Sequence, residues 1–390
     1  MPPIRVLVVD DSVVVRRLVA NALSGDPDIE VVGTAANGRI ALTKIEALRP
    51  QAITLDIEMP VMNGIETVRA LRRLGHRMPV VMFSTLTERG ATATLDALEA
   101  GANDYVTKPA NVGSISESLE QVRSSLIPKL KALCARPERR FAAGRPVVPD
   151  ALRPGSPRPG EGSPGRSETV AGTAPRRASD SPYRILAIGC STGGPEALGK
   201  VLAGLPRDLA VPVVVVQHMP PVFTAQFAAR LDRALPLTVV EAREGMPLRP
   251  GHVYIAPGDH HLRLAGTRAA VRTALDQGPQ ENFCRPAVDV LFRSVVALYG
   301  RDVLAAVLTG MGQDGRAGSV DIVKAGGSVI AQDEATSVVW GMPGSVVQAG
   351  AAEEIVPLGL IGPTLARRLA GSATAGATAG TAPYAAAVPR

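Results

Sequence analysis

Residues 136–182 limit what this chain can fold into, because they cannot form a packed core. They hold nine Pro and six Gly among 47 residues and include the sequence RPGSPRPGEGSPGR. A segment of this composition buries too little apolar surface to offset the entropy that it loses on ordering. We therefore expect residues 131–182 to be a flexible, disordered linker between two folded domains, at 1–130 and 183–370. Residues 371–390 are expected to form a low-complexity tail.

The positive charge of the chain is concentrated in that linker. The formal net charge is +6, and residues 131–182 contribute ten basic and five acidic side chains. Neither domain therefore has the basic excess expected of a nucleic-acid-binding protein. No stretch approaches the roughly 20 apolar residues of a membrane span, and the first apolar run is too short for a signal peptide. The sequence predicts a cytoplasmic protein that does not insert into a membrane.

Short apolar runs alternate with helical patterns in the first domain. The predicted strands are residues 4–9, 29–35, 52–56, 79–84 and 104–109. Strands that alternate with helices indicate a doubly wound parallel α/β sheet. In such a sheet, functional groups gather at the carboxyl ends of the strands.

Polar side chains stand at the ends of these strands. Asp10 and Asp11 follow the first strand, Asp56 ends the third, Ser84 ends the fourth and Lys108 lies at the end of the fifth. Three carboxylates at one edge repel one another unless a cation lies between them, and hard oxygen ligands suit Mg²⁺. A lysine beside them can hold an anion. We therefore predict a site for Mg²⁺ and a phosphoryl group, with Asp56 as the acceptor.

The motifs at these positions are similar to those of a known family. VVDDS, LDIEMPVMNG, FST and DYVTKP resemble the receiver domains of two-component response regulators, over about residues 3–125. The resemblance implies a flavodoxin-like fold and phosphorylation of Asp56 by a histidine kinase. It also implies that Asp11 and Asp56 bind Mg²⁺, with Asp10 helping through water and the carbonyl of Glu58 completing the site. The other implied residues are Lys108 beside the phosphoryl group, and Ser84 and Tyr105 as the switch that senses it. A receiver fold that is not phosphorylated is the alternative.

The second domain again alternates apolar runs with helical patterns. The predicted strands lie in RILAIG, VPVVVVQHM, HVYIAPG, VLAAVLTGMGQDG and GSVIAQD. We expect a second doubly wound parallel sheet, of the Rossmann-like type. The first of its strands ends in the turn GCSTGG, at residues 189–194.

Three interpretations of this turn compete: a phosphate-binding loop, a purely structural turn and a turn that holds a nucleophile. A dinucleotide-binding turn needs G-x-G-x-x-G followed by an acidic residue, but Ser191 occupies the place of the second glycine. A P-loop needs a lysine, which this turn lacks. A purely structural glycine turn and a catalytic serine are the remaining alternatives.

Residues at neighbouring strand ends favour the catalytic serine. His218 ends the next predicted strand, and Asp314 follows a third strand at the same edge of the sheet. Ser191, His218 and Asp314 would then act as nucleophile, base and orienting carboxylate. Backbone N–H groups at the start of the following helix point to where an oxyanion would form. The oxyanion candidates are Thr192 and Met311.

These segments also resemble a known family. GCSTGGPEAL, VVVVQHMPPVFTAQFAARL, VYIAPGDHHL and VLTGMGQDG are similar to the catalytic domain of CheB-type protein-glutamate methylesterases of bacterial chemotaxis, over about residues 183–368. The resemblance implies a Ser191–His218–Asp314 triad that needs no cofactor for ester hydrolysis. The implied substrates are glutamate γ-methyl esters on the cytoplasmic helices of methyl-accepting chemoreceptors, with release of methanol, and receptor glutamines, which are deamidated. The kinase that phosphorylates Asp56 would be a chemotaxis histidine kinase, and phosphorylation would move the receiver domain off the active site. A phosphorylation-gated binding module with a relic triad is the competing hypothesis.

Two cysteines and the linker depart from the pattern of the family. Cys190 stands where the family usually has a small alanine, so its thiol either competes with Ser191 or only fills the core. Cys284 lies in ENFCRPAVDVLF, a segment expected to border the substrate, and has no assigned role. The long linker lowers the effective concentration of the receiver domain at the active site, which predicts weak inhibition by that domain.

Overall fold

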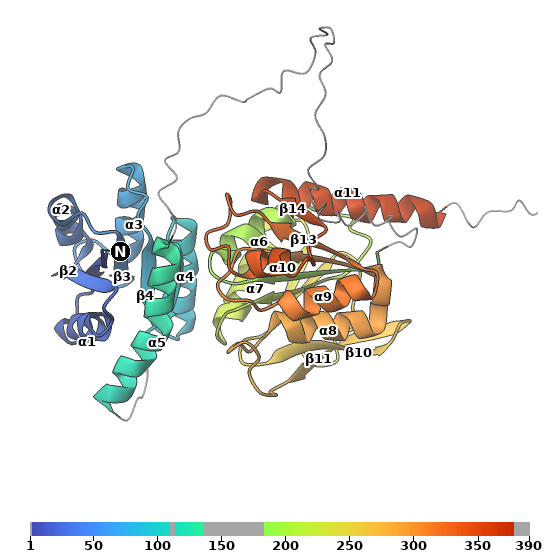
Figure 1. Cartoon of the computed structure of the whole chain (residues 1–390), viewed down its shortest axis with the longest axis horizontal. Helices are drawn as coiled ribbons and strands as arrows, with labels where there is room; N and C mark the ends of the chain where they lie inside the picture. Colours follow the sequence, from blue (N-terminus) through green and yellow to red (C-terminus); the bar gives the residue numbers. More distant parts are fainter. Residues whose placement is uncertain (1, 110–113, 136–182, 378–390) are drawn as a thin grey trace, which may run out of the picture.

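The computed structural model describes residues 2–109, 114–135 and 183–377 (Figure 1). The linker expected at 131–182 therefore lies outside the described residues from 136 onward. Helix α5 (Ile115–Cys134) extends beyond residue 130, and helix α11 (Leu358–Ala377) extends into the expected tail. The domain boundaries drawn from the sequence stay predictions.

The first domain is built on a five-stranded parallel sheet with the order β2-β1-β3-β4-β5. Its strands are β1 (Ile4–Val9), β2 (Ile29–Ala35), β3 (Ala52–Asp56), β4 (Val80–Ser84) and β5 (Asp104–Thr107). This strand order is that of flavodoxin-like folds. The predicted doubly wound sheet is confirmed, and each predicted strand agrees with the structure within two residues.

Helices cover both faces of this sheet. They are α1 (Val13–Ser24), α2 (Gly38–Leu48), α3 (Gly64–Arg73), α4 (Glu88–Glu99) and α5. Each begins after a polar residue whose side chain accepts a backbone hydrogen bond, as these residue types do at helix N-termini. The caps are Ser12, Asn37, Asn63, Thr87 and Ser114. Successive side chains of β1 point to opposite faces, so that Val6 and Val8 join the core under α1 and α5 while Leu7 and Val9 join the other core.

The second domain contains a seven-stranded parallel sheet with the order β14-β13-β12-β6-β7-β9-β8. Its strands are β6 (Ile185–Cys190), β7 (Val213–Gln217), β8 (Thr238–Glu241), β9 (His252–Ile255), β12 (Val303–Val307), β13 (Ser328–Gln332) and β14 (Glu354–Val356). Strand β6 has β7 on one side and β12 on the other, so the chain reverses its direction of winding there. In open α/β sheets this reversal opens a crevice at the carboxyl ends of the strands, where ligands bind.

Two helical layers and a hairpin complete the second domain. The helical elements are α6 (Gly194–Ala203), α7 (Phe223–Ala234), α8 (Val288–Tyr299), η1 (Gly300–Asp302), α9 (Arg316–Lys324), α10 (Met342–Gln348) and α11. Helices α6, α7 and α11 share one core with the sheet, and α8, α9 and α10 share the other. The antiparallel hairpin of β10 (His261–Thr267) and β11 (Ala270–Asp276) lies beside α8.

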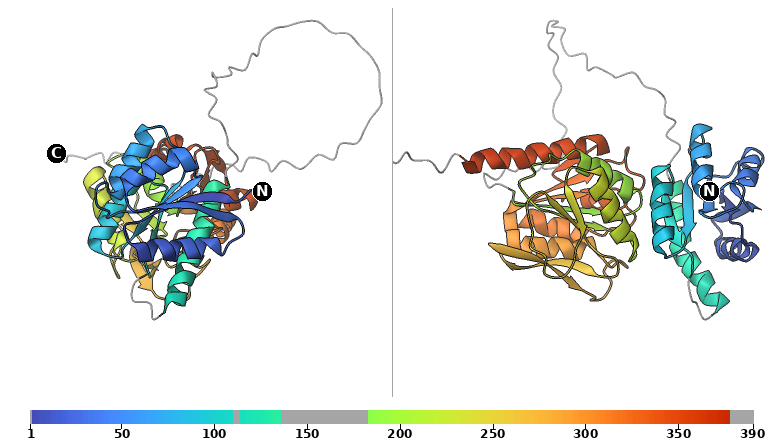
Figure 2. Two further views of the ribbon diagram at one scale, coloured as in Figure 1. Left: turned by 90° about the vertical axis from the view of Figure 1, so that its left-hand side faces the viewer. Right: turned by 180° about the vertical axis from the view of Figure 1, so that it is seen from behind.

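The two domains contact each other through α4 and β5 of the first domain and α7 of the second (Figures 1 and 2). Arg230 on α7 forms ion pairs with Asp96, at 2.6 Å, and with Glu99, both on α4. The ring of Tyr105 stacks on Phe223 with 4.7 Å between the ring centroids and an interplanar angle of 4°. Both charged and aromatic contacts therefore hold the receiver-like domain against the second domain.

Candidate active site and phosphorylation site

The first domain brings three carboxylates and one lysine together at the carboxyl ends of β1, β3 and β5. Oxygen atoms of Asp10, Asp11 and Asp56 lie within 4.8 Å of one another. The Lys108 Nζ lies 2.8 Å from Asp56 Oδ1 and 3.0 Å from Asp10 Oδ2. The Glu58 carboxylate is turned away and pairs with Arg89, so only its carbonyl is left for the role expected from the resemblance.

The electrostatics of this pocket follow from burial. Asp10 and Asp56 are buried, whereas Asp11 is exposed. Burial raises the pKa of Asp56 to about 6, against the lowering effect of the Lys108 ammonium. Burial also lowers the pKa of Lys108, but the hydrogen bond and charge of Asp56 outweigh this and raise it above its usual value. The pocket therefore concentrates negative charge around a site that suits a divalent cation.

The two expected switch residues lie on the path from this pocket to the second domain. Ser84 Oγ donates to the Gly90 carbonyl in α4, at 3.2 Å, and accepts from Thr94 Oγ1 at 2.7 Å. Tyr105 is buried and stacks on Phe223, as described above. Ser84 is thus hydrogen-bonded to the first half of α4. The second half of that helix carries Asp96 and Glu99, the carboxylates that pair with Arg230.

The turn after β6 places Ser191 at the switch point of the second sheet. Cys190 is the register partner of Gln217, so Ser191 and His218 follow neighbouring strands, and the His218 N–H donates to the Cys190 carbonyl. Gly193 adopts φ +75°, which favours glycine, and directly precedes α6. Gly310 is also required, because a Cβ there would lie 2.8 Å from the Ser191 Cβ. The loop that contains Met311 can therefore approach Ser191 only because residue 310 has no side chain.

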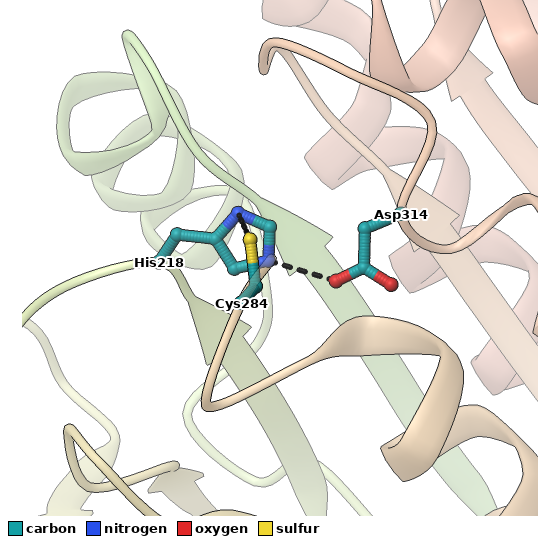
Figure 3. Close-up of side chains that lie close together, drawn as sticks. All are labelled: His218, Cys284 and Asp314. Atoms are coloured by element: carbon teal, nitrogen blue, oxygen red, sulfur yellow. Dashed lines mark hydrogen bonds and ion pairs between the residues drawn. The ribbon is translucent and has the colours of Figure 1, made fainter. Parts of the chain in front are cut away.

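His218 and Asp314 form a hydrogen-bonded pair (Figure 3). The His218 Nε2 lies 2.8 Å from Asp314 Oδ2, and Asp314 is 2% exposed. Asp314 also accepts hydrogen bonds from the backbone N–H groups of Val288 and Asp289 and from Asn282 Nδ2. Burial raises the pKa of Asp314, but the bond to His218 and these donors outweigh it and keep the pKa below its usual value. The carboxylate is therefore ionised and fixed in orientation.

A thiol contacts the other nitrogen of the imidazole. Cys284 Sγ lies 3.5 Å from His218 Nδ1, and Figure 3 shows the thiol over the face of the imidazole ring, whereas Asp314 meets the ring at Nε2. Burial lowers the pKa of His218, but the bonds to Asp314 and Cys284 raise it above the ordinary value of 6.5. Within the described residues, Ser191 Oγ makes no hydrogen bond to His218, although both residues line the same narrow pocket.

The other cysteine near the turn is part of the core. Cys190 is fully buried, and its Sγ faces the Val216 carbonyl at 3.8 Å. Burial raises the pKa of this thiol far above its usual value, which keeps it protonated. Cys190 therefore fits the role of a core side chain, and the thiol beside the base is Cys284.

The first domain contributes to the same narrow pocket. Asn103, Asp104 and Tyr105 line it together with Ser191 and His218. Thr192 Oγ1 donates a hydrogen bond of 2.6 Å to Asp104 Oδ2, and Lys129 Nζ lies 2.9 Å from Asp104 Oδ1. The receiver-like domain therefore lies over the turn that contains Ser191.

Sequence reasoning did not find Asn282, Asp289 or Asp104 as parts of these sites. Asn282 and Asp289 belong to the segment before and within α8, and they reach the site because that segment folds against Asp314. Asp104 is a buried carboxylate at the start of a strand, which is the signal that could have identified it.

A parallel sheet with an acidic pocket, joined to a second sheet with a Ser, His and Asp at its switch point, defines a response regulator with an enzymatic output domain. Family models match both parts: the response regulator receiver domain at residues 6–120 and the CheB methylesterase at residues 186–365. A protein-glutamate methylesterase/protein-glutamine glutaminase of Nocardioides sp. (strain ATCC BAA-499 / JS614) is 60% identical over 95% of this chain and 96% of its own length. The chain belongs to the CheB family of chemotaxis protein-glutamate methylesterase/protein-glutamine glutaminases.

Two further proteins are similar to this chain. The protein of the same name from Trichodesmium erythraeum is 46% identical over 95% of this chain and all of its own length. The crystal structure of the Thermotoga maritima CheB methylesterase catalytic domain has 44% identity, covers 47% of this chain and 98% of that one, and has a TM-score of 0.47. No helix in the described part of the chain combines the length and the apolar character that a bilayer span requires.

Proposed function

We propose that this enzyme hydrolyses glutamate γ-methyl esters on the cytoplasmic helices of methyl-accepting chemoreceptors and deamidates glutamines there, when Asp56 is phosphorylated. The observation that carries the proposal is the His218–Asp314 pair beside Ser191, at the switch point of a sheet that the receiver domain covers. The enzyme would act in the cytoplasm, where these helices and a chemotaxis histidine kinase are found.

Ser191 is the proposed nucleophile and His218 the proposed base. Because Nε2 of His218 is bonded to Asp314, Nδ1 is the nitrogen that takes the Ser191 proton. The serine oxygen attacks the ester carbonyl, and backbone N–H groups near Thr192 and Met311 stabilise the oxyanion. His218 then protonates the departing methoxide, which leaves as methanol. Water, activated by the same imidazole, releases glutamate from the acyl-enzyme.

Deamidation follows the same steps with a different leaving group. The γ-amide of glutamine replaces the ester, and His218 protonates the departing nitrogen, which leaves as ammonia. Asp314 stabilises the imidazolium in both reactions, and its own network of donors keeps it ionised. The chemistry uses side chains and water, so Mg²⁺ is needed only in the receiver domain.

Asp56 is the proposed phosphorylation site. Its buried carboxylate lies beside Asp10, Asp11 and Lys108, a set of hard oxygen atoms and one ammonium that suits Mg²⁺ together with a phosphoryl group. Asp10, Asp11, Asp56 and the Glu58 carbonyl would hold the ion, directly or through water. A bound ion would neutralise the negative charge of the carboxylates and the phosphoryl group, while Lys108 would pair with the phosphoryl oxygens.

Ser84 and Tyr105 are proposed to carry the signal to the active site. Ser84 Oγ donates to the Gly90 carbonyl, and a new bond to a phosphoryl oxygen would take that donor away. Loss of this bond would release α4, which holds Arg230, and would let Tyr105 leave Phe223. The receiver domain would then separate from the pocket that contains Ser191.

The test is methanol release from a methylated chemoreceptor cytoplasmic fragment. We expect release by the full chain to increase with acetyl phosphate and Mg²⁺, and Ser191→Ala to abolish it. Asp56→Asn should keep only the unstimulated rate. Ser124→Ala, an exposed serine on α5, is the matched control and should behave as wild type. Activity that survives Ser191→Ala would overturn the nucleophile, and no release by any protein would favour a binding module.

A further inference from the structure

Cys284, His218 and Asp314 form a second constellation in the active site. The thiol and the carboxylate both contact the imidazole, with 3.5 Å between Sγ and Nδ1 and 2.8 Å between Nε2 and Oδ2, and donor atoms of the three side chains lie within 4.8 Å of one another (Figure 3). A thiol beside an imidazole that a carboxylate orients is the arrangement that activates cysteine for reaction, because the thiolate is the reactive form. The nitrogen that contacts Cys284 is also the one that must serve Ser191.

A tight turn holds the thiol at this place. Backbone hydrogen bonds join Glu281 and Cys284 in both directions, and the two residues between them have φ angles of +53° and +61°. These residues are Asn282 and Phe283, and a bulky side chain at a positive φ is a strained conformation that persists only where other contacts hold it. Asn282 supplies such contacts, because its Nδ2 donates to Asp314 and to Asp289. The turn is therefore tied to the carboxylate of the proposed triad.

Cys284 differs from the other two cysteines of the chain in its surroundings. Cys190 is fully buried in the core. Burial raises the pKa of Cys134 to about 11, so its thiol is protonated at neutral pH. Cys284 is half-buried, and the preceding residue in its turn, Phe283, is 96% exposed, which places the turn at the protein surface. Of the three thiols, that of Cys284 is therefore the one that is both accessible to a small reagent and in contact with a base, His218.

We propose that Cys284 is a site of reversible oxidation by hydroperoxides, and that oxidation switches the esterase off. His218 takes the thiol proton, and the thiolate attacks the terminal oxygen of the hydroperoxide. An S–O bond forms, the O–O bond breaks, and the departing alkoxide or hydroxide takes the proton from His218 and leaves as an alcohol or water. Sulfur loses two electrons and the peroxide gains them, which leaves a sulfenic acid at Cys284.

The added oxygen is what stops catalysis. It lies on the sulfur atom that faces His218 Nδ1, so it occupies the space beside that nitrogen and forms a hydrogen bond with it. The imidazole can then no longer accept the proton of Ser191. A dithiol restores the enzyme, because it reduces the sulfenic acid to the thiol and forms its own disulfide and water. This inference rests on the proposed role of His218.

The first test measures methanol release by the full chain, with acetyl phosphate and Mg²⁺, before and after treatment with hydrogen peroxide. We expect wild type and Cys134→Ser, the matched control, to lose at least tenfold in rate and to recover with dithiothreitol. The rate of Cys284→Ala after treatment with peroxide should equal the rate of the same variant before treatment. Loss of activity in Cys284→Ala to the same extent as in wild type would overturn the proposal.

The second test measures the reactivity of the thiol itself and needs no substrate. Labelling of Cys284 by iodoacetamide at pH 7, followed by peptide mass spectrometry, is compared between wild type and His218→Asn. His218 can take the proton of the thiol as it reacts, whereas the side-chain amide in His218→Asn cannot, so we expect roughly tenfold faster labelling in wild type. Equal rates in the two proteins would overturn the proposal, whether or not methanol release is found. Ser191→Ala is the matched control and should label as fast as wild type.

Discussion

Thr192 Oγ1 donates a 2.6 Å hydrogen bond to Asp104 Oδ2, which joins the residue after the proposed nucleophile to the receiver domain. Both side chains are buried, with 4% and 5% of their surfaces exposed. A hydrogen bond to a charged group in such a place contributes about 1.5–3 kcal/mol. The contact therefore stabilises the closed arrangement of the two domains directly at the active site.

Removal of that contact should raise the unstimulated activity. In Asp104→Ala, the closed form loses the Thr192 bond, and we expect methanol release without phosphodonor to increase about tenfold, since 1.4 kcal/mol corresponds to a factor of ten. The stimulated rate should change little. Asp28→Ala, which removes an exposed carboxylate that pairs with Lys131, is the control. An unstimulated rate equal to that of wild type would show that this bond does not hold the domains together.

The ion pairs of Arg230 predict a salt-dependent contribution to closure. Arg230 meets Asp96 and Glu99 at a partly exposed surface, where an ion pair contributes about 0.5–1 kcal/mol. We expect Arg230→Glu to raise the unstimulated rate by roughly threefold to tenfold, and Asp96→Lys in the same chain to reverse part of the increase. Rates at 50 mM and 500 mM salt provide the check, because screening should raise the wild-type rate towards that of the variant. Additive effects of the two substitutions would contradict a direct pairing.

Much of the fold could be predicted because its strands are short apolar runs with clear ends. Residues 52–56 read AITLD and form β3 over the same range. The edge strands were harder, because β8 and β14 read TVVE and EIV and have exposed or half-buried positions. Such short runs carry no distinct period, and their strand structure comes from pairing with a neighbour.

The candidate site likewise has contacts that could be predicted from the sequence and contacts that could not. His218 and Asp314 could be paired from the sequence, because parallel strands end at a common edge. The contact of Cys284 with His218 could not, because the two residues are 66 positions apart and meet through a turn with two positive φ angles. No periodicity marks that turn, since side-chain contacts to Asp314 and Asp289 hold it. The domain interface depends in the same way on contacts between distant segments, such as Thr192 with Asp104.

The pH dependence of the esterase should report the pairing of His218. The imidazole must be neutral to accept a proton, so the rate increases as pH rises through its pKa, which lies above 6.5 because Asp314 and Cys284 raise it. Cys284→Ala removes one of these two effects and should move the midpoint to lower pH. The measurement is kcat/KM for methanol release between pH 5.5 and 10. A midpoint that is unchanged in Cys284→Ala would contradict the contact.

The stability of the receiver domain should depend on the charge of Asp56. Burial raises its pKa from 3.8 to about 6, so the folded state binds more protons than the unfolded state between these values, and stability falls as pH rises through them. Asp56→Asn lacks the free-energy cost of burying this charge and should be more stable than wild type at pH 7.5 by about 3 kcal/mol. Thermal unfolding without Mg²⁺ at pH 7.5 and pH 5 is the check, and the difference should shrink at the lower pH. Mg²⁺ should stabilise wild type more than the variant.

Phe283 should be a site where a polar substitution stabilises the protein. Its φ of +61° is strained for an aromatic side chain, whereas asparagine tolerates this region, and the ring is 96% exposed and so loses little packing when removed. We expect Phe283→Asn to raise the free energy of unfolding of the second domain by about 0.5–1 kcal/mol, which corresponds to about 1–4 °C in Tm. Leu360→Asn is the matched control, because Leu360 is also an exposed apolar residue but lies in α11 at an ordinary helical φ. That control should lower Tm slightly or leave it unchanged, so a gain in both variants would point to surface polarity and not to relief of backbone strain at Phe283.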